Sequence, residues 1–436
     1  MDLLNSKFLK ETAIEHTVTL RWVRKSFWAV IDQGLFATSN FFLNILLARW
    51  LVPIEYGAFT VAYTTFLFLS TFHTGLINEP MLVFGPGKYK DKIRAYLRTL
   101  ILGSWVLGII VGIVFLIVFL AFLNFSKSNL TPTLLVISIA SPIILFQWLM
   151  RKACYINLQP KLAAFAGFGY VALIFTGAFG LNYYEQLRPI NVLLIMALAH
   201  FFSGLWLFFK LRIHLNIHRD KELMVDVLNN HWKYGKWASG TAALSWIPCN
   251  VFILFLALWG GLEASAAYKA LINLVLPILH VVTASGAVML PILVEKRGSK
   301  EFRRLILYFS FPYILGPLLY FIFIRVFGDS MIHILYNGKY IEYVNLLWLI
   351  GIIPIVFAIV NLSVIVLQAL ELPYIIFRAH LISSVIVFTF GLLIVKVWGV
   401  YGAIVGWLIA YLAIGSILAG KFSLNKLNST YNFISS

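Results

Sequence analysis

The sequence predicts an all-α integral membrane protein with about 12 transmembrane helices, in two six-helix lobes around a central cavity and with both termini cytoplasmic. Three observations predict this class: the composition, the length of the apolar runs and the distribution of basic residues. Of the 436 residues, 61% are hydrophobic and 12% are charged, whereas a soluble protein is about half apolar and about a quarter charged. Lipid is therefore the solvent for most of this chain.

The apolar runs are long enough to be membrane helices. The run LILGSWVLGIIVGIVFLIVFLAFL (100–123) carries no charge over more than the roughly 20 residues that a bilayer span needs. Continuous runs favour helices over the alternating strands of a membrane barrel. Breaks at charged, proline and glycine residues then give the predicted spans 26–49, 54–79, 97–123, 132–151, 160–181, 189–210, 234–259, 264–290, 303–327, 344–370, 373–395 and 398–420. The predicted outer loops are short, the longest being 328–343.

The basic residues predict the orientation. If the N-terminus is placed in the cytoplasm, most Lys and Arg residues, Arg151 and Lys152 among them, fall on the cytoplasmic side of these spans. This is the positive-inside pattern, and it places both termini inside. It also accounts for the net charge of +17 without a nucleic-acid partner.

The longest cytoplasmic break, 212–237, divides the chain in two. It mixes charges with Leu223, Val227 and Leu228 at helical spacing, which predicts an interfacial amphipathic helix. Two six-helix halves are typical of transporters with a binding site between them. The predicted organisation is a cytoplasmic segment 1–25, a lobe 26–211, a linker 212–233, a second lobe 234–420 and a cytoplasmic tail 421–436.

The first span carries a polar stripe. Within WAVIDQGLFATSNFFLNILLARW (28–50), Gln33, Asn40 and Asn44 share one helix face and Asp32 flanks them. Such groups in a membrane helix face a bundle interior or a water-filled cavity, and hydrogen bonds between helices are the alternative. We expect a cavity wall.

The eighth span repeats the arrangement, with Lys269, Asn273 and His280 in one sector of ASAAYKALINLVLPILHVVTASGA (264–287). Lys269 either extends its ammonium to the membrane surface or faces the cavity, where it can meet an anionic substrate. The second span adds Thr64 and Thr71 on one side.

Further charged residues lie at the predicted mouths of the cavity. Arg24, Lys25 and Glu79 are near the cytoplasmic mouth and Arg49 is near the opposite one. They are either ordinary interface anchors or, together with Lys269, they make the cavity cationic.

No pattern typical of an enzyme is found. FGPGK (84–88) lacks the spacing of a phosphate-binding loop, and there is no nucleophile elbow and no Cys/His cluster at zinc spacing. We therefore expect no catalytic residue, no metal, no cofactor and no enzymatic activity.

Two stretches, DQGLFATSNFFLNILLARWLVPIEYGAFTVAY (32–63) and INEPMLVFGPGKY (77–89), resemble the polysaccharide-transporter family of the multidrug/oligosaccharidyl-lipid/polysaccharide (MOP) superfamily. These are lipid-linked oligosaccharide flippases of O-antigen type. The family's turn after a polar first helix is matched at Leu47, Ala48, Arg49, Leu51, Pro53, Glu55, Tyr56 and Gly57. The second half matches loosely through LWGGLEASAAYKAL (258–271), where Ala266 replaces the turn glycine.

The resemblance implies a multi-pass protein of the bacterial inner (cytoplasmic) membrane that acts in cell-surface polysaccharide biosynthesis. It would move an undecaprenyl-pyrophosphate-linked oligosaccharide from the cytoplasmic to the periplasmic leaflet by alternating access. Its implied partners are this polyprenyl-pyrophosphate-linked glycan, membrane lipids, a proton or sodium gradient and glycan polymerase machinery.

The candidate site residues follow from this implied substrate. Cations for the pyrophosphate are Arg24, Lys25, Arg49 and Lys269. Amides, hydroxyls and an imidazole for the sugars are Gln33, Asn40, Asn44, Thr64, Thr71, Asn273 and His280. Carboxylates for ion coupling are Asp32 and Glu79.

Three alternatives stay open. An ion-coupled multidrug or metabolite antiporter of the same superfamily would want a net acidic cavity for cationic drugs. An integral-membrane glycan ligase or polymerase would need a large periplasmic catalytic loop. A scaffold that recruits glycan enzymes through 212–237 would tolerate substitutions in the cavity.

Overall fold

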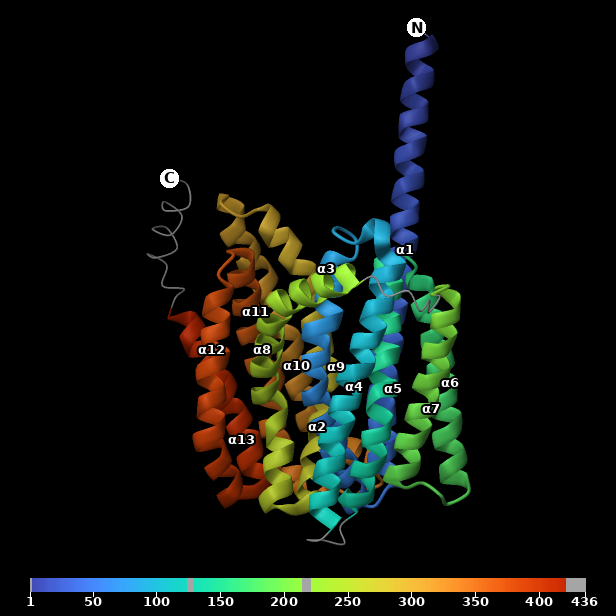
Figure 1. Cartoon of the computed structure of the whole chain (residues 1–436). Helices are drawn as coiled ribbons and strands as arrows, with labels where there is room; N and C mark the ends of the chain where they lie inside the picture. The colour runs from blue at the N-terminus through green and yellow to red at the C-terminus, as the bar shows by residue number, and fades with distance from the viewer. Residues whose placement is uncertain (1, 124–128, 214–220, 421–436) are drawn as a thin grey trace. The chain divides into compact units, whose positions relative to one another are not determined.

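The structure is a computed structural model that describes residues 2–123, 129–213 and 221–420, with side chains from residue 24 onward. All regular structure in these ranges is helical (Figure 1). The predicted cytoplasmic tail 421–436, residues 214–220 of the predicted linker and the side chains of most of the segment 1–25 lie outside the described part.

Ten helices in the described ranges are long and apolar enough to cross a membrane, which makes the chain a multi-pass membrane protein. They are Arg24–Trp50, Lys90–Leu123, Leu130–Ile156, Pro160–Tyr183, Pro189–Lys210, Lys221–Trp259, Gly261–Glu295, Lys300–Tyr336, Ile341–Ala369 and Pro373–Ala419.

This set differs from the predicted twelve spans at two places. The helix α2 (Pro53–His73) is not among the ten, and Pro373–Ala419 is one of them although Gly399, with φ 54° and ψ −129°, interrupts its helical backbone. A count of twelve and a cytoplasmic position of both termini stay predictions.

The chain forms two compact units. Unit 1 is Met1–Leu43 with Leu69–Ser239, and unit 2 is Asn44–Phe68 with Gly240–Ser436. The boundaries between the units therefore fall within α1 (Asp2–Trp50), α2 and α8 (Lys221–Trp259). The predicted division into lobes 26–211 and 234–420 stays a prediction.

Unit 1 contains the first part of α1 and, in chain order, a π-helical turn Thr74–Asn78, α3 (Glu79–Phe84), a 3-10 turn Lys90–Lys92, α4 (Ile93–Leu123), α5 (Leu130–Ile156), α6 (Pro160–Tyr183), α7 (Pro189–Lys210) and the start of α8. Helix α5 packs between α4 and α7. A Cβ added at Gly108 or Gly112 would lie 2.6 Å from Pro142 Cα or 2.5 Å from the Ser138 carbonyl oxygen. The spacing of these two glycines thus lets α4 approach α5 closely, as small residues do in membrane helices.

Unit 2 contains the end of α1, most of α2, the end of α8 and, in chain order, α9 (Gly261–Glu295), α10 (Lys300–Tyr336), a 3-10 turn Ile341–Leu346, α11 (Leu347–Ala369), α12 (Pro373–Ile386), a π-helical turn Val387–Gly391 and α13 (Leu392–Ala419). Helix α11 packs against α9, α10 and α13. The predicted outer loop 328–343 is wrong over most of its length, because α10 continues to Tyr336. The buried side chains of Ile332 and Tyr336 hold this extension in place.

The turn between α1 and α2 is fixed by the end of α10. Lys339 Nζ donates hydrogen bonds to the carbonyls of Arg49 (2.6 Å) and Leu51 (2.7 Å), which satisfies groups that a helix C-terminus leaves unpaired. In return, the Arg49 guanidinium donates to the Ile334 carbonyl. A Cβ at Gly57 would lie 1.9 Å from the backbone oxygen of Leu262, so only glycine fits at this point of the turn.

At the start of α8, Leu223 and Val227 are buried, whereas Leu228, which the sequence analysis grouped with them, is 53% exposed. The interfacial position of this segment stays a prediction. In Figure 1 these first turns lie close to α3 and are steeply inclined to the rest of α8. His231 Nδ1 donates to the Leu76 carbonyl in the π-helical turn (2.8 Å), so its Nε2 accepts the Tyr96 hydroxyl proton (2.7 Å).

A polar contact joins the first turns of α8 to the loop before α4. Asp226 accepts hydrogen bonds from Lys88 Nζ and from the Tyr89 hydroxyl, both at 2.8 Å, and from Asn230 Nδ2 at 2.9 Å. Burial and the neighbouring Asp226 carboxylate raise the pKa of Tyr89 to about 12. The Tyr89 phenol therefore stays protonated and keeps its donor role.

Candidate functional site

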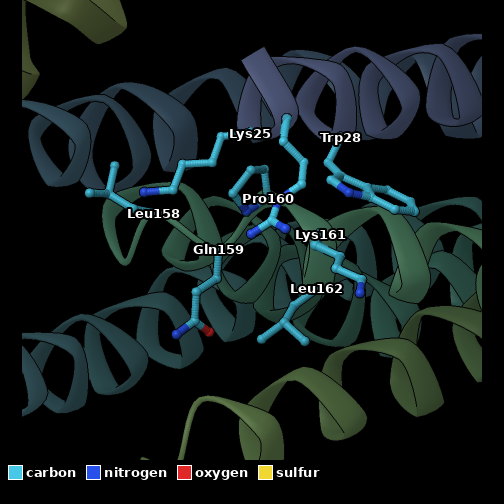
Figure 2. Close-up of a pocket in the computed structure, with 8 residues that line it drawn as sticks. Lys25, Trp28, Leu158, Gln159, Pro160, Lys161 and Leu162 are labelled. Carbon is cyan, nitrogen blue, oxygen red and sulfur yellow. The ribbon is translucent and has the colours of Figure 1, made fainter. Parts of the chain in front are cut away.

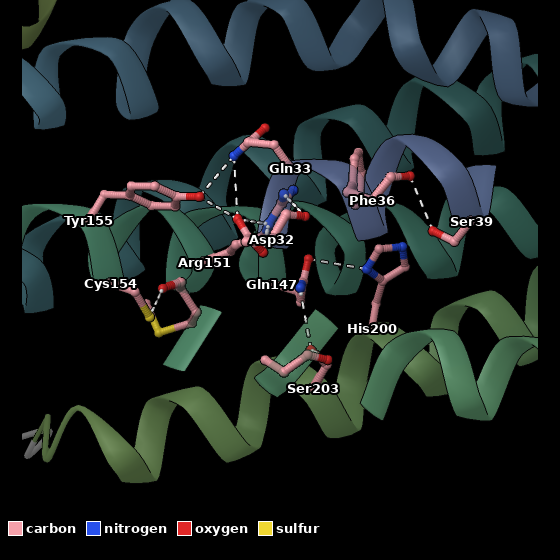
Figure 3. A network of polar contacts seen from close by, with 12 residues as sticks. Asp32, Gln33, Phe36, Ser39, Gln147, Arg151, Cys154, Tyr155, His200 and Ser203 are labelled. Atoms are coloured by element: carbon pink, nitrogen blue, oxygen red, sulfur yellow. Dashed lines mark hydrogen bonds and ion pairs between the residues drawn. The ribbon is translucent and has the colours of Figure 1, made fainter. Parts of the chain in front are cut away.

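A buried ion pair lies inside unit 1. Asp32 on α1 is 1% exposed, and Arg151 Nε on α5 lies 2.8 Å and 3.0 Å from its two carboxylate oxygens. Arg151 Nη2 also donates to the Asp32 carbonyl at 3.1 Å (Figure 3). A charge in an apolar interior is costly unless it is paired and hydrogen-bonded. Here the Arg151 guanidinium neutralises the Asp32 carboxylate.

Tyr155 and Gln33 complete the surroundings of this carboxylate. The Tyr155 hydroxyl donates to Asp32 Oδ2, and Gln33 Nε2 lies 2.9 Å from the Tyr155 oxygen and 3.3 Å from Asp32 Oδ2. The Arg151 guanidinium stacks over the Phe36 ring with 4.4 Å to its centroid, a cation–π contact. Asp32 is thus saturated with donors from its own chain.

A second polar layer continues from α5 to α7. His200 Nδ1 donates to Gln147 Oε1 (3.2 Å), and Gln147 Nε2 donates to Ser203 Oγ (3.4 Å). Figure 3 shows this chain of contacts beside the ion pair. A small cavity adjoins both layers and is lined by Asp32, Phe36, Gln147, Arg151, Gly167, Tyr170 and Val171.

Unit 2 holds a neutral polar chain instead. Asn273 on α9 is fully buried, and its Nδ2 donates to the Tyr56 hydroxyl at 3.0 Å. The Tyr56 hydroxyl in turn lies 3.4 Å from Asn44 Oδ1. Asn273 Oδ1 and the hydroxyls of Tyr268 and Tyr340 are buried without a hydrogen-bond partner in the described part of the chain, and such groups are rare in folded proteins.

Lys269 lies one helical turn before Asn273 on α9 and is partly buried. It makes no ion pair with the residues that the structure describes. An ammonium inside an apolar helix is costly without an anion nearby. The part of unit 2 that the structure describes therefore supplies no ion-pair partner for Lys269.

The sequence-predicted site residues divide between the two units. Unit 1 contains Arg24, Lys25, Asp32, Gln33, Asn40, Thr71 and Glu79, and unit 2 contains Asn44, Arg49, Thr64, Lys269, Asn273 and His280. That both sets line one common cavity stays a prediction.

Within each unit, some of these residues lie together. In unit 1, Asp32 and Gln33 share the network above, and Arg24 and Lys25 line one open pocket. In unit 2, Asn44 and Asn273 are joined through Tyr56.

Other predicted residues lie apart. The Arg49 guanidinium is engaged by the Ile334 carbonyl, so this predicted pyrophosphate ligand already has a structural partner. His280 is exposed, Thr64 is buried and Glu79 is partly buried at the start of α3.

Sequence reasoning missed Arg151 and Tyr155. The fourth span was expected to end at residue 151, which made Arg151 a membrane-surface base, whereas α5 continues to Ile156 and places Arg151 inside the helix. A pattern for them was present, because Gln147, Arg151 and Tyr155 recur every four residues and so share one helix face. Tyr56 was recognised in the turn motif but not as a hydrogen-bonding group.

No family model and no curated protein matches the sequence, but solved structures do. The lipid II flippase MurJ in an inward closed conformation gives a TM-score of 0.73 at 14% identity, covering 93% of this chain and 87% of that one. An inward-facing multidrug resistance MATE family transporter of the MOP superfamily gives 0.69 at 13% identity, covering 94% and 100%.

A third structure, a MOP superfamily transporter from Pyrococcus furiosus whose reverse polarity of binding pocket is said to suggest a different function, gives 0.63 at 14% identity, covering 92% and 95%. These likenesses show that the chain has the fold of MOP-superfamily transporters. The expected superfamily fold is confirmed, and the polysaccharide branch stays a prediction.

Proposed function

We propose that this protein translocates an undecaprenyl-pyrophosphate-linked oligosaccharide from the cytoplasmic to the periplasmic leaflet of a bacterial inner membrane, for cell-surface polysaccharide biosynthesis. The proposed mechanism is alternating access without an enzymatic step. The fold shared with a lipid II flippase supports it. The observation that carries it is the sign of the charge left unmatched inside the membrane helices.

Of the three charges Asp32, Arg151 and Lys269, the one left without an ion pair among the described residues is the cation Lys269. Arg151 neutralises Asp32 within unit 1, while Lys269 makes no ion pair within the described residues of unit 2. A transporter for cationic drugs needs uncompensated acid at its site, whereas a pyrophosphate needs cations. The same fold carries a pocket of reverse polarity in the Pyrococcus furiosus transporter, so pocket charge varies within this architecture.

The neutral polar groups suit a sugar. Hydroxyl-rich glycans are bound by amides and hydroxyls that both donate and accept hydrogen bonds. Gln33, Asn40, Asn44, Asn273 and Thr71 are groups of this kind, and Asn273 has a buried carbonyl oxygen without a partner. The polyprenyl tail would remain in lipid.

Ion coupling is proposed through Asp32 and Glu79. Asp32 is bound by Arg151 and Tyr155, so a proton or sodium ion can engage its carboxylate only by displacing these donors. Coupling at Asp32 therefore requires that the ion pair with Arg151 opens during the transport cycle.

A multidrug or metabolite antiporter is the second candidate, favoured by the full coverage of the MATE transporter at a TM-score of 0.69. The deciding experiment is a strain that lacks this protein, in which lipid-linked glycan and its leaflet are assayed. Glycan trapped on the cytoplasmic leaflet is expected. Normal glycan export together with altered drug sensitivity would establish the antiporter instead.

A further inference from the structure

An open pocket in unit 1 lies between residues 24–28 of α1 and the turn that joins α5 to α6 (Figure 2). Its lining residues are Arg24, Lys25, Trp28, Leu158, Gln159, Pro160, Lys161 and Leu162. Three of these are cations and none is an acid. Lys161 is the third cation.

One wall of the pocket is aromatic. Trp28 of α1 stacks on Phe165 of α6 with 5.6 Å between ring centroids. Lys161 Nζ lies 5.7 Å from the Trp28 centroid and 5.6 Å from that of Phe165. These cation–π contacts hold the ammonium at the pocket wall without neutralising its charge.

The opposite wall is a fixed turn. Leu158 adopts a left-handed conformation with φ 54°, and the amides of Leu158 and Gln159 donate to the carbonyls of Tyr155 and Cys154 at 3.0 Å and 2.8 Å. Helix α6 then starts at Pro160 without a side-chain cap. The positive end of its dipole adds to the field of the three cations.

The position of the pocket identifies its ligand class. The sequence-predicted spans 26–49 and 160–181 begin next to these residues, and this prediction places the three cations where hydrocarbon gives way to the headgroup layer. Leu158, Leu162 and Trp28 supply apolar surface beside them. Cations beside apolar side chains at the expected headgroup level are suited to bind a phosphate that is attached to a lipid chain.

We propose that this pocket binds the phosphate of a membrane lipid, with Arg24, Lys25 and Lys161 as its cations. This inference deepens the proposed function, because it names where the lipid phosphate of the substrate docks before translocation. The same chemistry is offered by the pyrophosphate of a polyprenyl lipid and by an anionic phospholipid, and the test separates these two sources.

The test measures lipid binding by the full-length protein in phosphatidylcholine nanodiscs that contain either undecaprenyl pyrophosphate or phosphatidylglycerol. Native mass spectrometry reads the retained lipid for the wild type, Arg24→Gln and Lys161→Gln. The matched control is Lys210→Gln, an exposed lysine at the end of α7 whose Nζ lies 5.7 Å from the Trp206 ring centroid. Thermal unfolding verifies that every variant is folded.

Each pocket variant is expected to retain about tenfold less undecaprenyl pyrophosphate than the wild type, because it loses one charge-assisted contact, and Lys210→Gln to retain as much as the wild type. An equal loss of phosphatidylglycerol without preference for the polyprenyl lipid would support the pocket with bulk phospholipid as its occupant. Unchanged retention in both pocket variants, or an equal loss in Lys210→Gln, would overturn the proposal. A wild type that binds the lipid but translocates no glycan counts against the proposed function alone.

Discussion

The two units handle polar groups inside the membrane in different ways. Unit 1 pairs a carboxylate with a guanidinium, Asp32 with Arg151, and surrounds them with Tyr155 and Gln33. Unit 2 builds a neutral chain from Asn273 through Tyr56 to Asn44 and leaves Lys269 without an ion pair among the described residues.

In unit 1 the buried charges neutralise each other within the protein, whereas Lys269 in unit 2 needs water or a bound anion beside it. A buried pair with full hydrogen bonding needs nothing from outside, but removal of either partner leaves a bare charge. A cation without a counter-charge is stabilised only by water or by an anion. Loss of one partner is therefore expected to destabilise unit 1 more, whereas the proposed anionic substrate would be met by Lys269 in unit 2.

The largest effect is expected from Arg151→Met. It leaves the Asp32 carboxylate buried without its counter-charge, which costs about 3–5 kcal/mol. The double variant Asp32→Asn/Arg151→Met removes both charges and is expected to recover most of this loss. Equilibrium unfolding in mixed micelles measures both, and equal stability of the single and double variants would contradict the ion pair.

Tyr56→Phe is expected to cost less, about 1–3 kcal/mol, because it leaves the buried Asn273 amide without its acceptor but creates no bare charge. Tyr63→Phe is the matched control, since Tyr63 stacks between Phe59 and Phe66 and none of the described hydrogen bonds involves its hydroxyl. The same unfolding assay compares them. If Tyr63→Phe costs as much as Tyr56→Phe, the neutral chain contributes no specific stability.

Lys269→Gln is expected to lower transport at least about tenfold, equivalent to about 1.4 kcal/mol, without loss of stability, because it removes a cation that forms no ion pair with the residues that the structure describes. Glycan export in cells with matched protein levels is the readout. Lys396→Gln, an exposed lysine on α13, serves as control. Full export by Lys269→Gln would remove this lysine from the proposed site.

The smallest effect is expected from Asp226→Asn, below about 1 kcal/mol. Its ion pair with Lys88 resembles the Asp32 pair in length, at 2.8 Å, but the two side chains are 45% and 46% exposed. Water and salt screen such a pair. Equilibrium unfolding at low and high salt tests this. A loss of unfolding free energy as large as that of Arg151→Met would mean that burial does not decide how much these ion pairs stabilise the protein.

Helix positions were the part of the fold that the sequence predicted best. The span 189–210 coincides with α7, and 160–181 is two residues short of α6. Both helices begin at a proline, which fits the first helical turn and marks a start that can be read locally. The end of α5 was missed because the charged Arg151 is buried there, and the end of α10 because exposed polar residues such as Asp329 and Ser330 alternate with the buried Ile332 and Tyr336. Hydropathy does not register the tertiary contacts that bury these side chains.

The candidate site was predicted in its residue types but not in its pairings. The sequence alone determined that the protein is helical and lies in lipid, and that Asp32, Asn273 and Lys269 are polar groups inside apolar helices. Only the tertiary structure decided that Asp32 pairs with Arg151, 119 residues away. It also decided that the Arg49 guanidinium donates a hydrogen bond to the Ile334 carbonyl near the end of α10. Helix propensity and hydropathy act over a few turns, whereas the partner of a buried charge is set by which distant helices pack together.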